Sequence, residues 1–175
     1  MSTLTVIVNA LLFQVAWFAA VVGAARGMPW LGVLVAAAVA AIHVARARVP
    51  GRELALLLVA TLLGVAFETA LAWSGLLQFD GGALLAGIAP VWMIALWANF
   101  ATTLNVSLRL LQNRLLPAAL LGAVGAPLAY YAGTKLGAVA MPDPRSALVA
   151  IAAGWALLTP LLFFGARRLD GYAPR

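Results

Sequence analysis

The sequence contains no cysteine and only one histidine. The lack of cysteine excludes disulfides, thiolate metal sites and cysteine nucleophiles together. A single histidine excludes a multi-histidine metal centre within one chain. We therefore predict no metal site and no cofactor.

Charged residues are also scarce. Only 9% of the 175 residues are Asp, Glu, Lys or Arg, whereas 65% are hydrophobic. A soluble globular domain needs a larger polar surface, so the composition predicts an integral membrane protein. The net charge of +6 comes from residues that lie between apolar runs and form no basic patch interleaved with aromatic residues. We therefore expect no nucleic-acid partner.

The apolar residues fall into six runs, each close to the roughly 20 residues that a membrane-spanning helix needs. Proline, glycine and polar residues separate the runs, for example at Pro50-Gly51, in the loop with Gln78 and Asp80, and at Met141-Pro142-Asp143-Pro144. The sequence predicts an all-α, polytopic integral membrane protein with one transmembrane domain over residues 1–175. The six helices of this bundle are expected at about 4–25, 30–45, 53–73, 87–108, 115–139 and 146–166.

The first run could also be a cleaved signal peptide, because it ends in small residues from Gly23 to Ala25. However, no basic region precedes it, and its apolar residues are interrupted by Asn9 and Gln14. We interpret it as a retained helix.

Basic residues are distributed unequally between the two sides of the predicted bundle. If both termini are cytoplasmic, the three outside residues are Arg26, Lys135 and Arg145, and eight basic residues lie inside. Cytoplasmic loops carry an excess of Lys and Arg, so we predict that both termini are cytoplasmic. The eight inside residues are Arg46, Arg48, Arg52, Arg109, Arg114, Arg167, Arg168 and Arg175.

The segment from Pro90 to Arg114 is the only apolar run with a dense row of polar side chains. Amides and hydroxyls in lipid must find partners inside the protein. The row therefore indicates either a polar cavity or hydrogen bonds that fix helix packing, and the same two interpretations apply to Gln14 and Asn105. Trp92 and Trp97 could belong to an interface belt or line a cavity. Spacings of three and four place one set on a single helix face: Trp92, Ala95, Asn99, Thr102, Thr103 and Val106.

Glu68 is a carboxyl inside the third run. Such a group must be paired, protonated or placed in a wet cavity, because an isolated intramembrane charge is costly. It could be a proton carrier, a general base or a cation-binding group, or it could be a structural carboxyl held by hydrogen bonds. Its depth is close to that of Tyr130, Tyr131 and Lys135, and Arg26 is a further candidate partner. For His43 we expect a position at the headgroup level beside Arg46.

Five small residues recur at steps of three and four along the fifth run. This pattern lets two helix backbones approach closely and predicts a helix-packing face. Its members are Gly122, Ala126, Ala129, Gly133 and Gly137.

Three segments resemble a known bacterial inner-membrane family, catalogued as domain of unknown function 2878. The resemblance covers nearly the whole chain and is most specific in its middle segment. It implies a small multi-pass protein of the bacterial inner (cytoplasmic) membrane with no assigned activity. The segments are Asn9-x3-Phe13-Gln14-x2-Trp17, Ala89-Pro90-x-Trp92-Met93-x2-Leu96-Trp97-x2-Phe100-Ala101-x-Thr103-Leu104-Asn105-x-Ser107, and Pro127-x2-Tyr130-Tyr131-x-Gly133.

Three functions remain open from the sequence. The favoured one is binding or handling of a lipid or small amphiphile in an intramembrane polar cavity, which makes membrane lipids the expected partners. The second is a scaffold subunit for a membrane-protein partner or a second copy of the chain. The third is an intramembrane enzyme or proton-coupled transporter using Glu68, although the usual catalytic motifs are missing. The candidate site comprises Glu68, Asn99, Thr103, Gln14, Trp92 and Tyr130.

Overall fold

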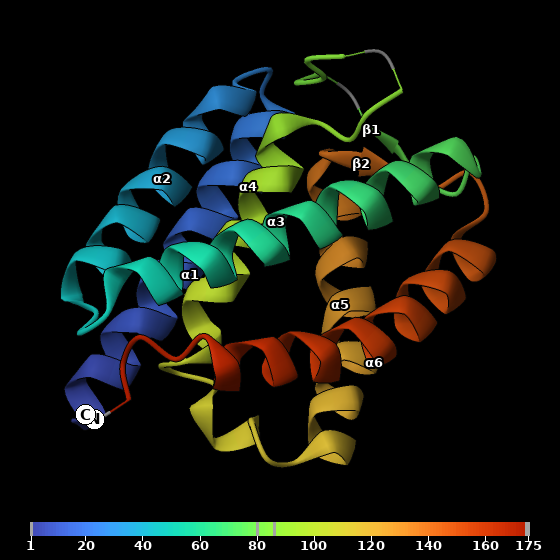
Figure 1. Cartoon of the computed structure of the whole chain (residues 1–175). Helices are drawn as coiled ribbons and strands as arrows, with labels where there is room; N and C mark the ends of the chain where they lie inside the picture. The colour runs from blue at the N-terminus through green and yellow to red at the C-terminus, as the bar shows by residue number, and fades with distance from the viewer. Residues whose placement is uncertain (1, 80, 86, 174–175) are drawn as a thin grey trace.

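The structure, a computed structural model, describes residues 2–79, 81–85 and 87–173. Six α-helices dominate it (Figure 1), so the predicted all-α class is confirmed. Two two-residue strands and one short 3-10 helix lie in the connections. The elements are α1 (Thr3–Ala25), α2 (Pro29–Arg46), α3 (Pro50–Trp73), β1 (Gln78–Phe79), α4 (Val91–Leu104), η1 (Arg109–Leu111), α5 (Leu115–Leu136), β2 (Val139–Ala140) and α6 (Pro144–Arg168).

Five of the helices are long and apolar enough to cross a membrane, and α4 is the exception. Its 14 residues rise about 21 Å, which is less than the ~30 Å hydrocarbon core of a bilayer. The expected range was 87–108. The helix starts later because Gly87 adopts a left-handed φ of +80° and Pro90 is its extended N-cap. It ends at Leu104 with Asn105 as its C-cap, after which turns and η1 lead to α5.

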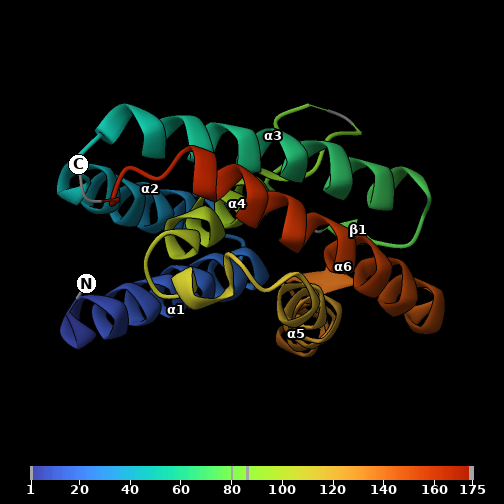
Figure 2. The ribbon, with the colours of Figure 1, turned by 60° about the horizontal axis from the view of Figure 1, so that its bottom comes forward.

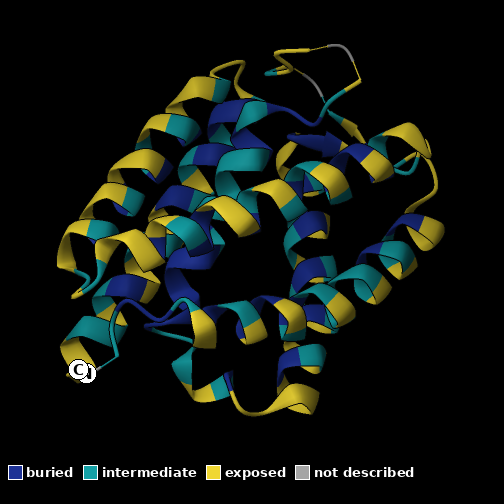
Figure 3. Cartoon of the chain, in the orientation of Figure 1, coloured by how far each residue is buried: buried dark blue, intermediate teal, exposed yellow. Residues whose placement is uncertain are grey.

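Many residues on the outer faces of the helices are exposed (Figure 3), and large apolar side chains are among them. Leu4, Leu34 and Leu157 are 70%, 67% and 75% exposed. Leucine side chains that are exposed to this extent are costly in water and favourable in lipid. Together with the length of the helices, they indicate a membrane protein.

One end of the bundle, here called the strand end, gathers three connections. β1 pairs with β2 in antiparallel register, with Gln78 opposite Ala140 and Phe79 opposite Val139. This pairing joins the α3–α4 connection to the α5–α6 connection. Gly82 lies against Pro29, which brings the α1–α2 turn to the same end.

The opposite end, here called the tail end, holds the residues that follow α6. The Gly171 amide donates to Glu53 at the start of α3, and the Tyr172 hydroxyl donates to the carbonyl of His43 near the end of α2. Helix α1 begins and helix α6 ends at this end (Figures 1 and 2). The six helices therefore alternate in direction, as the predicted topology requires.

The basic residues follow this division. Arg26, Lys135 and Arg145 lie beside the connections of the strand end, and seven of the eight predicted inside residues lie in or beside those of the tail end. The eighth, Arg175, lies outside the described residues, as does Asp80 of the α3–α4 loop. The charge asymmetry is therefore an asymmetry between the two ends of the folded chain.

α4 lies at the centre of the arrangement and packs against α1, α2, α3 and α6. α5 packs most extensively against α6, and α3 and α6 run side by side in opposite directions (Figure 2). Three apolar clusters fill the described interior, and two of them are large. One includes Trp92 and Ile151 near the strand end, and the other includes Leu104 and Phe163 nearer the tail end.

Small residues allow the closest helix contacts. A Cβ on Gly32 would meet the backbone of Ala20, and one on Gly122 would meet the carbonyl of Trp155. Within the predicted packing face of α5, three members are buried: Gly122, Ala126 and Gly133. Ala129 is only half-buried. Gly137 does not belong to this face, because it ends α5 in a left-handed conformation with φ +84° and is exposed.

Candidate functional site

A cavity of about 750 Å³ lies between α1, α4, α5 and α6. Its lining extends along α1 from Val6 to Val21, a rise of about 22 Å, so it is elongated along the helices. Ile7, Leu121 and Leu128 line it and are also exposed. The cavity therefore opens between α1 and α5, on a face that carries apolar side chains.

The lining is mainly apolar and aromatic. Among the lining residues, which all belong to the described part of the chain, none is Asp, Glu, Lys, Arg or His. The hydroxyl and amide side chains of the lining are Gln14, Thr103, Ser107, Tyr130 and Thr159. A concave apolar surface with a few neutral polar groups is typical of sites for small, largely apolar molecules.

Stacked aromatic rings form one wall of the cavity. The rings of Trp97 on α4 and Trp155 on α6 stack with centroids 4.5 Å apart and an interplanar angle of 27°. Phe100 meets Trp155 edge-on at 5.2 Å. On the other side, Trp97 packs onto Gly64 of α3, where any Cβ would overlap the indole ring. The wall is thus held by three helices.

Glu68 lies behind this wall and does not line the cavity. Its side chain is fully buried, and its Oε1 accepts hydrogen bonds from the Trp97 indole N–H at 3.0 Å and from the Tyr130 hydroxyl. Its Oε2 has no hydrogen-bond partner among the described residues. The carboxyl therefore joins α3 to α4 and α5. Two cavity-lining residues direct their polar atoms to it and present mainly ring carbons to the cavity.

The structure brings most of the sequence-predicted site together. Gln14, Trp92, Thr103 and Tyr130 line the cavity, and Glu68 contacts it through Tyr130.

Asn99 is the exception, because it does not line the cavity. Its Nδ2 donates to the carbonyl of Phe13 at 3.0 Å, which ties α4 to α1. The predicted polar face of α4 is thus divided between two surroundings. Ala95 packs toward α1 and α2, and Val106 faces a small hollow that residues of the same two helices also line. Trp92 and Thr103 turn toward the cavity.

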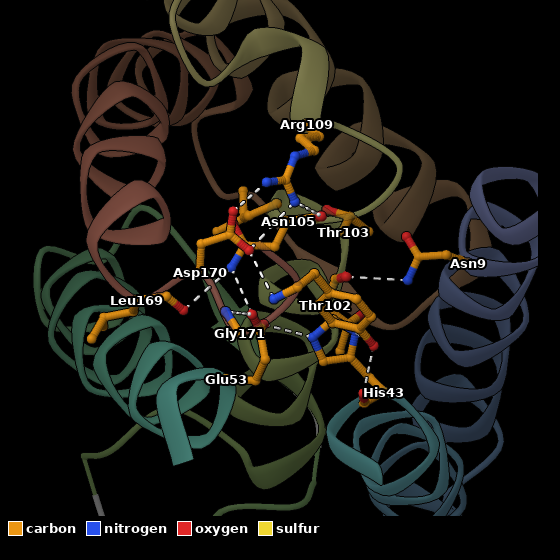
Figure 4. Close-up of polar contacts among 12 residues, drawn as sticks. Asn9, His43, Glu53, Thr102, Thr103, Asn105, Arg109, Leu169, Asp170 and Gly171 are labelled. Atoms are coloured by element: carbon orange, nitrogen blue, oxygen red, sulfur yellow. Dashed lines mark hydrogen bonds and ion pairs between the residues drawn. The ribbon is translucent and has the colours of Figure 1, made fainter. Parts of the chain in front are cut away.

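A second polar cluster lies at the tail end (Figure 4). Its centre is Glu53, which is fully buried in the first turns of α3. Glu53 Oε2 pairs with His43 Nε2 at 2.8 Å. Glu53 Oε1 accepts from Asn105 Nδ2 at 2.8 Å and from the Gly171 amide at 2.7 Å. One carboxyl therefore connects α2, α3, the end of α4 and the chain that follows α6.

The surrounding residues complete this cluster. Arg109 contacts Asp170 and also donates to the carbonyl of Asn105 at 3.1 Å. Gln112 Nε2 donates to Asn105 Oδ1 at 2.6 Å, and the Tyr172 hydroxyl donates to the His43 carbonyl at 2.5 Å. Burial, and secondarily the charge of Glu53, raises the pKa of Tyr172 to about 12. Both oxygens of Glu53 have partners, so the cluster has the features of a structural clasp.

Sequence reasoning missed this clasp. In the sequence, Glu53 is only the first residue of the expected third helix, and the pattern around His43 predicts a position at the headgroup level beside Arg46. His43 is instead 4% exposed and paired with Glu53. The position of His43 on its helix does not indicate that it is buried, because its partner Glu53 and the covering residue Tyr172 come from other parts of the chain. In the described part of the chain, no three His, Cys, Asp or Glu side chains converge in a way that could hold a metal ion.

Comparison with known proteins identifies a family to which no activity is assigned. No curated protein and no solved structure matches the chain. Residues 6–161 match the family described as protein of unknown function (DUF2878). This match covers most of the chain and includes the cavity, both tryptophans of its wall and Glu68. The chain therefore belongs to the DUF2878 family of proteins of unknown function.

Proposed function

We propose that this chain is a multi-pass membrane protein that binds or handles a lipid or another long amphiphile in the cavity between α1, α4, α5 and α6. The observation that carries the proposal is the cavity itself. Its volume of about 750 Å³ falls within the range of about 300–1,000 Å³ that is usual for small-molecule sites. Its apolar lining suits a hydrocarbon chain.

The direction of the cavity supports a lipid rather than a compact ligand. It runs along α1 for about 22 Å, whereas half of a bilayer core is about 15 Å deep. A long chain could therefore lie along the helices. Ile7, Leu121 and Leu128 are exposed at the opening, so such a molecule would enter sideways from the bilayer.

The distribution of charge supports an orientation. Cytoplasmic loops are enriched in Lys and Arg, and the tail end holds most of the basic residues. We place the tail end in the cytoplasm and the strand end outside. The bacterial inner membrane is the proposed location.

Native mass spectrometry of the detergent-purified chain, with identification of every lipid that co-purifies, tests the proposal. Gly125 lines the cavity, and a Cβ there would meet only Leu121, at 3.9 Å. Gly125→Leu should therefore occupy the cavity and remove the bound species. Gly165→Leu is the matched control, because Gly165 has open space around it and does not line the cavity.

One defined lipid species on the wild type and on Gly165→Leu, lost from Gly125→Leu, is the expected result. The same bulk mixture of membrane lipids on all three proteins would contradict the proposal. That outcome would favour a role as a subunit that docks a membrane-protein partner.

A further inference from the structure

The cavity is closed where it approaches the strand end of the bundle. On α1, the lining residue Val21 is only 3% exposed, and it belongs to one apolar cluster with Trp92 and Met93 of α4. Lining residues of α5 and β2 are buried at the same end. These buried lining residues are called here the closing residues, and they are Val21, Trp92, Met93, Tyr130, Gly133 and Val139.

The pair of short strands backs the closing residues. Phe79 of β1 lies opposite Val139 of β2 in the antiparallel register. Phe79 also meets the Trp92 ring edge-on, with centroids 5.9 Å apart and an interplanar angle of 79°. A Cβ on Gly133 would lie 3.3 Å from the Val139 side chain, so α5 and β2 are in close contact there. The closed end is therefore packed by parts of the chain that are far apart in the sequence.

The opening lies between the middle of the helices and the tail end. α1 begins at the tail end, and its exposed lining residues, Ile7, Ala10 and Gln14, lie in its first half and at its middle. Ile7 is 49% exposed, in contrast to Val21. α5 also begins at the tail end, and its exposed lining residues are Leu121, before its middle, and Leu128, just past it. The cavity is therefore open to the bilayer mainly along its tail-end half.

The polar groups of the lining follow the same division. Ser107 lies in the turn after α4, is half-buried and forms no side-chain hydrogen bond with another described residue. Gln14 is exposed at the middle of α1. At the closed end, the Tyr130 hydroxyl is directed to Glu68, and the Trp92 indole nitrogen is buried. A polar group of a ligand would therefore meet polar side chains from the middle of the cavity to the tail end.

We propose that the cavity takes one hydrocarbon chain of a lipid from the leaflet on the tail-end side, with the terminal methyl group against the closing residues and the polar head at the tail end. This inference rests on the proposed lipid-binding function and adds the direction of the ligand and the leaflet that supplies it. The opposite direction would bury the polar head among the closing residues, and a buried polar group without a partner is costly. The tail end also carries most of the basic residues, which attract anionic lipid head groups.

Two photoreactive palmitic acids test the direction. One carries a diazirine at the end of its chain, and the other carries it beside the carboxyl group. Each is irradiated with the purified wild-type chain, and the labelled residues are mapped by mass spectrometry. The terminal diazirine should label closing residues such as Val21 and Met93, and the carboxyl-side diazirine should label Ile7 or Leu121 at the opening. The reverse pattern should be at least about tenfold weaker, because the polar head has no partner at the closed end.

Val21→Phe fills the closed end of the cavity. The terminal label should therefore move from Met93 to residues nearer the middle, such as Phe13 and Phe100, while the carboxyl-side label stays at the opening. Val15→Phe is the matched control, because Val15 lies on the same helix, is exposed and does not line the cavity. It should leave both labels unchanged.

Met93→Ala keeps the test valid where Val21→Phe destabilises the helix packing. Truncation of Met93 lengthens the cavity at its closed end. The ratio of stearate to palmitate binding should therefore rise about fivefold over the wild type, because relief of overpacking favours the longer chain. Native mass spectrometry measures this ratio with both acids at equal mole fraction in the detergent. An unchanged ratio would mean that the chain does not reach the closing residues and would overturn the inference.

Failure of the direction and failure of lipid binding are distinguishable. Gly125→Leu, which fills the middle of the cavity, should remove both labels. The reversed pattern, or the same residues labelled by both probes, would overturn the proposed direction and leave lipid binding intact if Gly125→Leu still removes the labels. No label on the lining, or labels that Gly125→Leu does not change, would overturn the proposed function and the inference with it.

Discussion

The Trp97 indole of α4 donates to Glu68 of α3 at 3.0 Å and packs against Gly64. Gly64 lies one turn before Glu68 on α3. The ring is therefore fixed at both its polar atom and its face. Tyr130 of α5 donates to the same carboxyl oxygen, so three helices meet at Glu68. Of the two interpretations of Glu68 that the sequence leaves open, these hydrogen bonds favour the structural one.

Removal of the Glu68 carboxyl should destabilise the chain. Glu68→Leu leaves the Trp97 N–H and the Tyr130 hydroxyl buried without an acceptor, at a cost of about 1–3 kcal/mol for each group. Glu68→Gln keeps an acceptor oxygen and should cost less. Thermal unfolding of the detergent-purified proteins, followed by circular dichroism, measures both. An unchanged midpoint for Glu68→Leu would refute this structural role.

The contact between α5 and α6 should tolerate a methyl group at one glycine and not at another. A Cβ on Gly122 would overlap the Trp155 carbonyl, whereas a Cβ on Gly125 makes only an ordinary contact. Gly122→Ala should therefore cost about 1–3 kcal/mol, as overpacking usually does. Gly125→Ala should be neutral or slightly stabilising, because alanine favours a helix more than glycine does. Equal unfolding midpoints for the two variants would show that the helices do not approach as closely as described.

The tail-end clasp should respond to strongly alkaline pH. The pKa of Tyr172 is raised from 10.0 to about 12, first because the hydroxyl is buried and then because Glu53 is nearby. Because the folded value is the higher one, the folded chain holds this proton more tightly than the unfolded chain. The stabilising contact with His43 is therefore complete below pH 10 and is lost as the pH rises toward 12.

Phenolate absorbance of the wild type minus that of Tyr172→Phe isolates this titration. We expect a midpoint near 12. A midpoint at the ordinary value of tyrosine would mean that the tail is detached from His43 in solution.

The proposed orientation is testable because the chain has no natural cysteine. Gly51→Cys places a thiol at the tail end in open surroundings, and Gln78→Cys places one at the strand end on an exposed residue. In intact bacterial cells that express the chain, a membrane-impermeant maleimide should label only Gln78→Cys. Both should react after the membrane is permeabilised, and labelling of Gly51→Cys in intact cells would reverse the orientation.

The positions of the helices could be predicted from the sequence because apolar runs and their proline- and glycine-bearing breaks are local signals. Depth could also be estimated, since a constant rise per residue put Glu68 and Tyr130 at similar levels. That the two side chains face each other depends on helix rotation and packing, which one sequence does not specify. For the same reason, the polar row of α4 was read as one face, although Asn99 bonds to α1 and Trp92 and Thr103 line the cavity.

Two features had no local signal at all. The cavity is the space that the side chains of four helices leave between them. No pattern of residues in the sequence indicates such a space. The clasp depends on Gly171 and Tyr172 returning to Glu53 and His43 after more than 100 residues of intervening chain. The sequence predicts a longer fourth helix than the structure shows. The reason is that apolar residues such as Ile88 before α4 and Leu108 after it extend the hydrophobic run beyond the helix.

Photo-crosslinking with a long-chain alcohol that carries a diazirine on its chain tests most directly whether the cavity holds a lipid chain. The purified protein is irradiated with the probe, and the labelled residues are mapped by mass spectrometry. The account predicts labels on cavity-lining residues such as Phe13, Phe100 and Leu121, which disappear when excess unlabelled alcohol is added. Labels spread over outward-facing residues such as Leu34 and Leu157, and unaffected by competitor, would contradict it.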